Sequence, residues 1–368
     1  MTIKKISIFS LIFIIFILFV YHFKAGEDSK TIIIPSNEGQ PVNDRQKSSF
    51  FQVKNIYPIP KLVKLIGWSS PDSIIGFFYK NASEKQSNQL QRLSSPYDRP
   101  KNIETVSSSM SDFSMSPDGK KLIETTTSST NISLSLKTSQ NEKKEIKRIS
   151  PRNELFVQTV TWSNNSKWMT YLIVDPLNQQ TSKVGIYDTE TGKLKTLPLL
   201  QIDNKASLIN VAISDDGQRL LLTTSERSGS KKRIYMGNIK NDHVALSKEY
   251  QNSYGDPIWL NRNQFVYIGV GNTLYEYDQR NGDISALLEN VTNVELSNDR
   301  KKIAYSLYGD ENIYAGNLQG KNILYKESIY HSTIPLEMAW SIDGNSLLVY
   351  YPLIENRISS NSYVITFH

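Results

Sequence analysis

Five aspartates recur at one position of a repeated pattern, and their type and spacing make them the first candidates for chemistry. Each lies one or two residues after a serine that ends an apolar run, as in FSMSPDGKKLIETT at 113–126. They are Asp118, Asp215, Asp216, Asp299 and Asp343. If the repeats form a ring, these carboxylates share one face, where they could bind a cation or act as an acid–base pair. The simpler interpretation is turn chemistry, in which each Asp accepts backbone hydrogen bonds from its own hairpin.

Other residue types that perform chemistry are sparse. The chain has no cysteine, which excludes disulfides and thiolate metal sites, and none of its four histidines has a partner at H-x-x-x-H spacing. These histidines are His22, His243, His331 and His368, and we expect the two internal ones, His243 and His331, in exposed linkers between strands. There is no G-x-S-x-G nucleophile motif, and Gly269-Val270-Gly271 is not followed by the third glycine of a phosphate loop. The sequence therefore assigns no catalytic, cofactor-binding or metal-ligating residue and no cofactor.

The charge pattern argues against nucleic acid as a partner. The formal net charge is +6, but the basic residues fall in short runs such as Lys143-Lys144 and Lys301-Lys302, each beside an expected strand. A nucleic-acid surface needs a denser basic stripe with interleaved aromatic residues. We interpret the runs as solvated strand edges.

The elements that must position these residues form a repeat. Seven copies of an apolar run, a polar turn and a second apolar run follow one another, 37 to 51 residues apart. A period near 45 residues is typical of four-stranded propeller blades. The copies are anchored at Ser69, Ser116, Ser163, Ser214, Leu260, Ser297 and Ser341.

The local pattern predicts an all-β fold. Runs of alternating apolar residues indicate half-buried strands, and Asp-Gly pairs such as Asp118-Gly119 suit tight hairpins. No window of the repeat region has a sustained helical period. We predict a β-propeller of four-stranded blades, with seven blades favoured and six as the alternative. The last copy leaves room for three strands, so a strand from 50–56 should complete its blade and close the ring.

These motifs resemble the TolB-type, WD40-like propeller repeat. The matching residues are Ser116-Pro117-Asp118-Gly119, Ser341–Gly344 and the run from Tyr187-Asp188 through Thr191-Gly192 to Leu197. The resemblance covers roughly residues 55–368, although the copies at 160–174 and 258–270 lack the Asp-Gly pair. It implies the propeller fold and, by analogy, partner binding on one face of the disc. It implies no particular activity.

The N-terminus predicts a membrane anchor. Lys4 and Lys5 precede 18 residues without a formal charge, 6–23, which approach the length of a transmembrane helix. Cleavage after Ala25 or Gly26 would place Phe23 or Lys24 at the −3 position, where a small residue is needed. We therefore predict an uncleaved single-pass anchor at 1–24, a flexible linker at 25–49 and the propeller at 50–368. The positive-inside rule places the N-terminus in the cytoplasm and the propeller outside the membrane.

Two functions remain open from the sequence. The first is a non-enzymatic binding module, monomeric, tethered by 6–23 and engaging an unknown protein or cell-envelope ligand. The alternative is an extracytoplasmic hydrolase or lyase with a carboxylate and cation site at the channel. Composition rich in Lys, Asn, Ile and Ser suggests a bacterial source.

Overall fold

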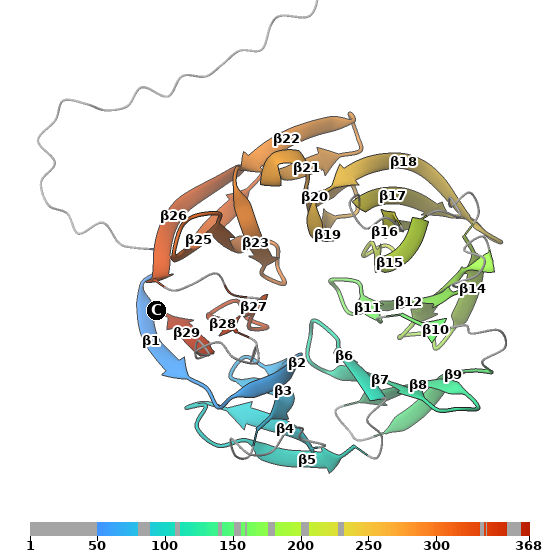
Figure 1. Ribbon diagram of the computed structural model, residues 1–368, viewed down its shortest axis with the longest axis horizontal. Helices are drawn as coiled ribbons and strands as arrows, with labels where there is room; N and C mark the ends of the chain where they lie inside the picture. Colours follow the sequence, from blue (N-terminus) through green and yellow to red (C-terminus); the bar gives the residue numbers. More distant parts are fainter. Residues whose placement is uncertain are drawn as a thin grey trace, which may run out of the picture. The chain divides into compact units, whose positions relative to one another are not determined.

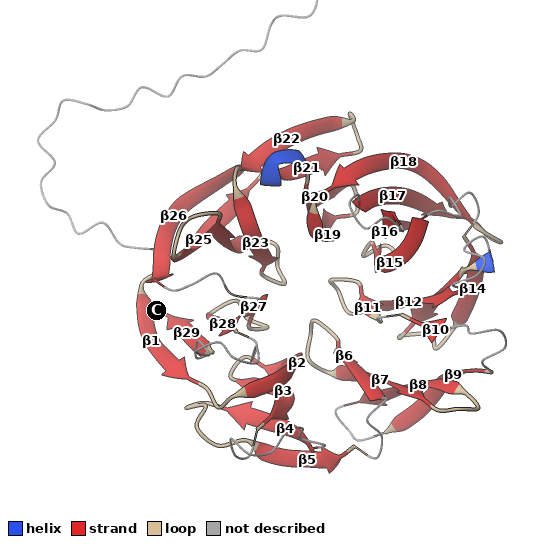
Figure 2. Ribbon diagram, viewed as in Figure 1, coloured by secondary structure: helices blue, strands red, loops and turns tan. Residues whose placement is uncertain are grey.

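The computed structural model describes a ring of seven β-sheets (Figure 1). The described residues are 50–79, 89–106, 111–138, 142–150, 156–158, 160–175, 181–199, 206–226, 232–331, 335, 337–351 and 362–368. Strands make up nearly all of the regular structure in these ranges (Figure 2). Each sheet is one blade of the ring (Figure 1).

The strands of the first four blades follow the chain. Blade 1 contains β2 (Leu62–Ser70), β3 (Ser73–Phe78), β4 (Gln89–Ser94) and β5 (Lys101–Thr105). Blade 2 contains β6 (Ser111–Met115), β7 (Lys121–Thr127), β8 (Ile132–Thr138) and β9 (Lys143–Ile149). Blade 3 contains β10 (Phe156–Val157), β11 (Thr161–Trp162), β12 (Trp168–Val174), β13 (Lys183–Asp188) and β14 (Leu194–Pro198). Blade 4 contains β15 (Ala206–Ile213), β16 (Arg219–Glu226), β17 (Lys232–Ile239) and β18 (Val244–Asn252).

The remaining three blades complete the ring. Blade 5 contains β19 (Tyr254–Asn261), β20 (Gln264–Ile268), β21 (Leu274–Asp278) and β22 (Asp283–Leu288), with the 3-10 turn η2 (Val270–Asn272) between its middle strands. Blade 6 contains β23 (Val291–Leu296), β24 (Lys302–Leu307), β25 (Asn312–Gln319) and β26 (Asn322–His331). Blade 7 contains β27 (Glu337–Trp340), β28 (Ser346–Tyr350), β29 (Tyr363–Phe367) and β1 (Val53–Pro58).

The two ends of the propeller share blade 7. Strand β1 pairs antiparallel with β29, from Val53 opposite Phe367 to Pro58 opposite Tyr363. The first strand of the domain therefore supplies the outer strand of the last blade, as the sequence predicted, two to three residues later than expected. This pairing covers the edge that β29 would otherwise expose. The count of seven blades is confirmed, and the six-bladed alternative is wrong because the degenerate copies at 67–79 and 258–270 both form complete blades.

Tryptophans tie neighbouring blades together. In four blades an indole from the inner strand donates a hydrogen bond back to the inner strand of the preceding blade. Buried apolar clusters fill the spaces between blades, as the alternating strand faces require. The donors Trp68, Trp162, Trp259 and Trp340 reach Ala339, Ser114, Ala212 and Glu295 over 3.0, 3.1, 3.1 and 3.3 Å respectively.

The predicted anchor at 6–23 and linker at 25–49 lie outside the described residues. Within the described ranges no helix has the length and apolar character needed to cross a membrane. The anchor, its orientation and the boundaries of the three segments stay predictions.

Candidate functional site

The repeated serine, with an aspartate or asparagine two residues later, forms one turn motif in the inner hairpins of five blades. In blade 2, Ser116 Oγ donates to Asp118 Oδ1 over 2.6 Å, and the same carboxylate oxygen accepts the backbone N–H of Lys120 over 3.1 Å. The serine hydroxyl also accepts the backbone N–H of Lys121 over 2.9 Å. The same pattern joins Ser214 to Asp216, Ser297 to Asp299 and Ser341 to Asp343, and in blade 3 it joins Ser163 to Asn165. Four of the five candidate aspartates therefore perform turn chemistry.

Asp215 has a different structural role, between blades. Its carboxylate accepts the backbone N–H of Asn165 over 2.9 Å, and its own carbonyl accepts from the Asn165 side chain over 2.9 Å. These two bonds join the turn of blade 3 to that of blade 4. The fifth candidate is thus also used in holding turns together.

The hairpin turns meet near the axis of the ring (Figure 1). Asn164 of blade 3 donates to the carbonyl of Asn298 in blade 6 over 2.7 Å. Asn298 in turn donates to the carbonyl of Pro117 in blade 2 over 2.8 Å. Blades far apart in the sequence therefore bring these turns to one face, the hairpin face, as the repeat predicted. The hydrogen bonds of these two asparagine side chains hold the turns of three blades together on that face.

The described residues hold no cluster of three His, Asp or Glu side chains arranged to bind a metal. His243 lies in the turn between β17 and β18, with Nδ1 at 2.7 Å from Asp242. His331 is the last residue of β26, so the prediction that it lies in a linker is wrong. Its Nε2 is 3.7 Å from Glu311 Oε2. Both pairs are local and exposed.

Three other carboxylates lie on inner strands and were not singled out from the sequence. Burial raises the pKa of Glu295, on β23, to about 8, and neighbouring Glu337 adds to the rise while Arg300 opposes it. Glu337, on β27, is an exposed residue, yet desolvation of its carboxyl group by the surrounding protein raises its pKa. Burial also raises the pKa of Asp256, on β19. Carboxyl groups with raised pKa values on adjacent inner strands are candidates for proton transfer.

Arg300 is the cation whose charge opposes the rise in the pKa of Glu295. It occupies the turn position that Gly119, Gly217 and Gly344 fill elsewhere, with a positive φ of 60°. Burial lowers its pKa, against the opposing effect of Glu295, Asp215 and Asp299. An arginine held in the left-handed region costs backbone energy and places its side chain among the acidic groups at the hairpin face.

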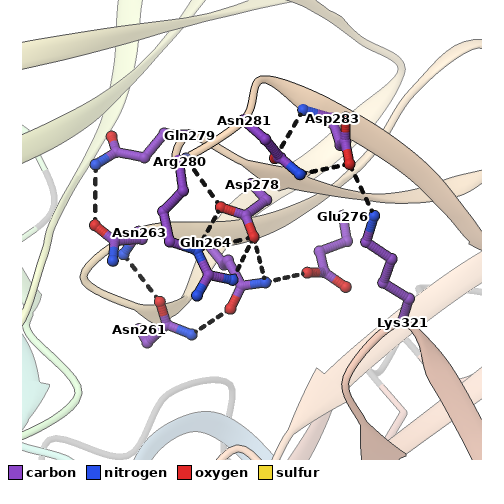
Figure 3. A network of polar contacts seen from close by, with 10 residues as sticks. All are labelled: Asn261, Asn263, Gln264, Glu276, Asp278, Gln279, Arg280, Asn281, Asp283 and Lys321. Atoms are coloured by element: carbon purple, nitrogen blue, oxygen red, sulfur yellow. Dashed lines mark hydrogen bonds and ion pairs between the residues drawn. The ribbon is translucent and has the colours of Figure 1, made fainter. Parts of the chain in front are cut away.

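A second polar cluster lies at the two hairpins of blade 5 (Figure 3). Glu276 on β21 is only 2% exposed, and its Oε1 accepts from Gln264 Nε2 over 2.6 Å. Its Oε2 has no hydrogen-bond partner among the described residues, and burial raises the pKa of this carboxyl group. Gln264 also donates to Asp278 over 3.1 Å. The cluster places one carboxyl group with a raised pKa beside another whose pKa is lowered.

Asp278 is the member with the lowered pKa. Its hydrogen bonds with the Arg280 guanidinium lower the pKa to about 2, and it accepts the backbone N–H of Arg280 over 3.0 Å. Asp278 is the counterpart of Asp188, whose carboxylate caps the same turn in blade 3. The cluster is therefore an extended turn network, in which Glu276 is the unusual residue.

A groove of about 170 Å³ lies between blades 1 and 2 and is the candidate binding site. Its apolar wall is formed by Ile75, Leu90, Ile103, Met115 and Leu122, and its charged lining by Arg92, Glu104, Lys120, Lys121 and Lys137. An engineered apolar cavity of about 150 Å³ accepts benzene, so the groove has room for a group of about that size.

Two side chains explain why the groove lies here. Met115 stands at the inner-strand position that Trp68 and Trp162 occupy, so no indole packs back from blade 2 onto blade 1. Arg92 stands on β4 opposite Ile75, at the position that Ile186 fills opposite Thr170 in blade 3. A flexible thioether and an exposed cation fill less of the space between blades than an indole and a buried aliphatic side chain.

The cations of the groove differ in how far they are paired. Lys137 Nζ lies 2.6 Å from Glu104 and 3.1 Å from Glu124, and these carboxylates raise its pKa against the opposing effect of burial. Lys121 donates to the carbonyl of Ser166 over 3.1 Å. The side chains of Arg92 and Lys120 are exposed and form no ion pair within the described residues. Thr138 Oγ1, also in the lining, is buried and has no hydrogen-bond partner within the described ranges.

The chain matches no family model, and no curated protein matches it by sequence. Solved structures match its fold. An oligogalacturonate lyase in complex with manganese has a TM-score of 0.56 at 9% identity, over 85% of this chain and 91% of the lyase. TolB from Acinetobacter baumannii matches at 0.44 and 13%, over 80% of each chain. The C-terminal WD40 domain of Sif2 matches at 0.48 and 11%, over 86% of this chain and 99% of that domain. At such identities only the fold is shown, and it rests on the match whose TM-score exceeds 0.5.

Proposed function

We propose that this protein is a membrane-anchored, extracytoplasmic binding module whose ligand site is the groove between blades 1 and 2. The groove carries the proposal because it combines an apolar wall with exposed cations that the fold does not use. The recurring aspartates, by contrast, are engaged in turns, and the described ranges contain no group of three His, Asp or Glu side chains arranged to bind a metal ion. Concave sites with few polar groups on an apolar lining are typical ligand sites.

The location outside the membrane rests on the N-terminal sequence. Lys4 and Lys5 before the apolar stretch 6–23 support an uncleaved anchor with the N-terminus inside. The linker 25–49 then allows the propeller to stand away from the bilayer. A tethered propeller can present its hairpin face to a protein or an envelope ligand.

Site-specific crosslinking in intact cells tests the binding function. A photoreactive amino acid at Ile103, 42% exposed in the groove lining, should yield a defined crosslinked species. The matched control is Ile284, which is 52% exposed on the outer strand of blade 5 and should yield none. Equal crosslinking from both positions, or none from either, would contradict a partner at the groove.

The absence of cysteine gives a direct test of the location. Lys301→Cys places one thiol at an exposed turn of the propeller. A membrane-impermeant maleimide should label it in intact cells as completely as after lysis. Labelling that requires lysis would place the propeller in the cytoplasm and overturn the proposed topology.

A hydrolase or lyase is the second candidate, supported by Glu295 and Glu337. A carboxyl group whose pKa is about 8 is protonated at neutral pH, so Glu295 could serve as a general acid. Activity on an envelope polysaccharide that Glu295→Gln abolishes, while groove substitutions leave it unchanged, would replace the binding function with this one.

A further inference from the structure

The groove between blades 1 and 2 has a charge pattern that selects its ligand. Four cationic residues line it against one carboxylate, that of Glu104. Lys137 is paired with Glu104 and Glu124, and Lys121 is directed to the Ser166 carbonyl. Arg92 and Lys120 remain as exposed cations whose charges the described ion pairs do not neutralise. A ligand that fills the groove therefore meets positive charge at its polar end.

The apolar wall determines the chemistry and size of the other end of the ligand. Leu90 is 1% exposed and Ile103 is 42% exposed, so the wall extends from the buried core to the surface. Met115 supplies a flexible side chain that adapts to a planar group. The size of the groove limits this end to about one six-membered ring.

Resting on the proposed binding function, we propose that the groove binds a ring that bears an oxyanion, either a phosphate or a carboxylate. The oxyanion lies at Arg92 and Lys120, where a guanidinium offers paired donors and an ammonium a point charge. The ring packs against Leu90, Ile103 and Met115. The ligand is either a free molecule or a unit of an anionic envelope polymer, and the two share this chemistry.

The repeat supplies a matched control for Lys120. In blade 6, Asp299-Arg300-Lys301-Lys302 is the counterpart of Asp118-Gly119-Lys120-Lys121. Lys302 donates to the carbonyl of Gly344 over 2.7 Å, as Lys121 donates to Ser166 over 3.1 Å. Lys301 and Lys120 are thus exposed lysines at equivalent positions. Of these two, Lys120 lines the groove and Lys301 does not.

The test is calorimetry of the full chain in lipid nanodiscs, with empty nanodiscs subtracted. Phenyl phosphate is the probe, and we expect a dissociation constant of about 1 mM for a ligand of this size. Lys120→Gln and Arg92→Gln should each weaken binding about fivefold, as expected for one exposed charge pair. Lys301→Gln should leave it unchanged, and neutral benzyl alcohol should not bind. Affinity should fall as salt is raised.

Further probes distinguish the sources of the oxyanion. Benzoate binding as tightly as phenyl phosphate supports a carboxylate ligand, and weaker benzoate binding supports a phosphate. Methyl phenyl phosphate, a diester, should bind as well as the monoester if the ligand is an internal polymer unit, and less well if it is free.

Three results would overturn the inference: no binding of phenyl phosphate or benzoate, equal binding of benzyl alcohol, or equal weakening by Lys301→Gln. Circular dichroism confirms that each variant is folded. If the probes fail while Ile103 still crosslinks a partner in cells, the ligand class is wrong and the binding function stands. If both fail, both are wrong.

Discussion

Two interfaces between blades use the same strand positions in opposite ways. Between blades 3 and 4, twelve buried aliphatic side chains of the described residues form one cluster. Between blades 1 and 2, the corresponding cluster contains five buried side chains, three aliphatic and two phenylalanines, and the groove lies beside it. The third strand shows the difference at one position, where Ile186 is 4% exposed and Arg92 is exposed. One repeat can therefore seal an interface or leave it open by changing single residues on a constant backbone.

The largest effect is expected when the open interface is copied into the sealed one. Ile186→Arg places a cation in an apolar cluster without a partner, and burying an unpaired charge costs several kcal/mol. We expect the free energy of unfolding to fall by about 4 kcal/mol or more, measured by urea unfolding of the full chain. The reciprocal change, Arg92→Leu, should alter stability by less than about 1 kcal/mol. Comparable losses from both substitutions would mean that the two interfaces do not differ as described.

The interface between blades 5 and 6 lies between these two cases, because the same strand position holds a polar side chain that is buried. Glu276 occupies the position of Ile186 and Met236 as a buried carboxyl group. Its pKa is raised in the folded chain, so the folded state holds its proton to higher pH than the unfolded state does. Its contribution to stability is therefore complete below the unfolded pKa and is lost as pH rises through the folded pKa.

Glu276→Met should remove this pH dependence. We expect the free energy of unfolding to rise by about 1–2 kcal/mol at pH 8 and by less at pH 4, since replacing a buried charge with an apolar residue often stabilises the fold. Urea unfolding at the two pH values measures it, with Glu289→Met, at an exposed glutamate, as the control. A gain that is larger at pH 4 would contradict the raised pKa.

A smaller effect is expected from restoring the missing indole. Met115→Trp places at blade 2 the residue that blades 1 and 3 carry, and the indole should occupy the groove. We expect phenyl phosphate binding to weaken more than about tenfold, with stability changed by about 1–3 kcal/mol if the site is overpacked. Met115→Leu, of similar volume, is the control and should keep the affinity within about threefold. Unchanged binding in the Trp variant would place the ligand elsewhere.

The smallest effect concerns the carboxylate of the groove. Glu104→Gln removes the negative charge that lines the groove and pairs with Lys137. Binding of phenyl phosphate should tighten about two- to threefold, because a partly exposed charge contributes roughly 0.2–1 kcal/mol. Calorimetry at low salt gives the greatest sensitivity. Weaker binding in this variant would show that the Glu104 carboxylate does not repel the bound anion.

The sequence by itself determined the repeat, the strand order and the closure of the ring. Alternating apolar runs and Ser-x-Asp-Gly turns act over a few residues, so their structural meaning can be predicted from spacing alone. The role of Asp118, Asp216, Asp299 and Asp343 in turns was foreseen for the same reason. Arg300 stands in the sequence where the other turns have glycine, but its positive φ and its acidic neighbours are seen only in the folded chain.

Only the tertiary structure decided where a site could lie. Glu295 and Glu337 are 42 residues apart in the chain, and their interaction depends on the packing of adjacent blades. Arg92 and Lys120 likewise line one groove because blade 1 packs on blade 2. Burial, and with it the pKa of a carboxyl group, depends on neighbours that the local pattern does not name. The repeat therefore predicts the fold, while single departures from it, visible in sequence but interpretable only in space, mark the candidate site.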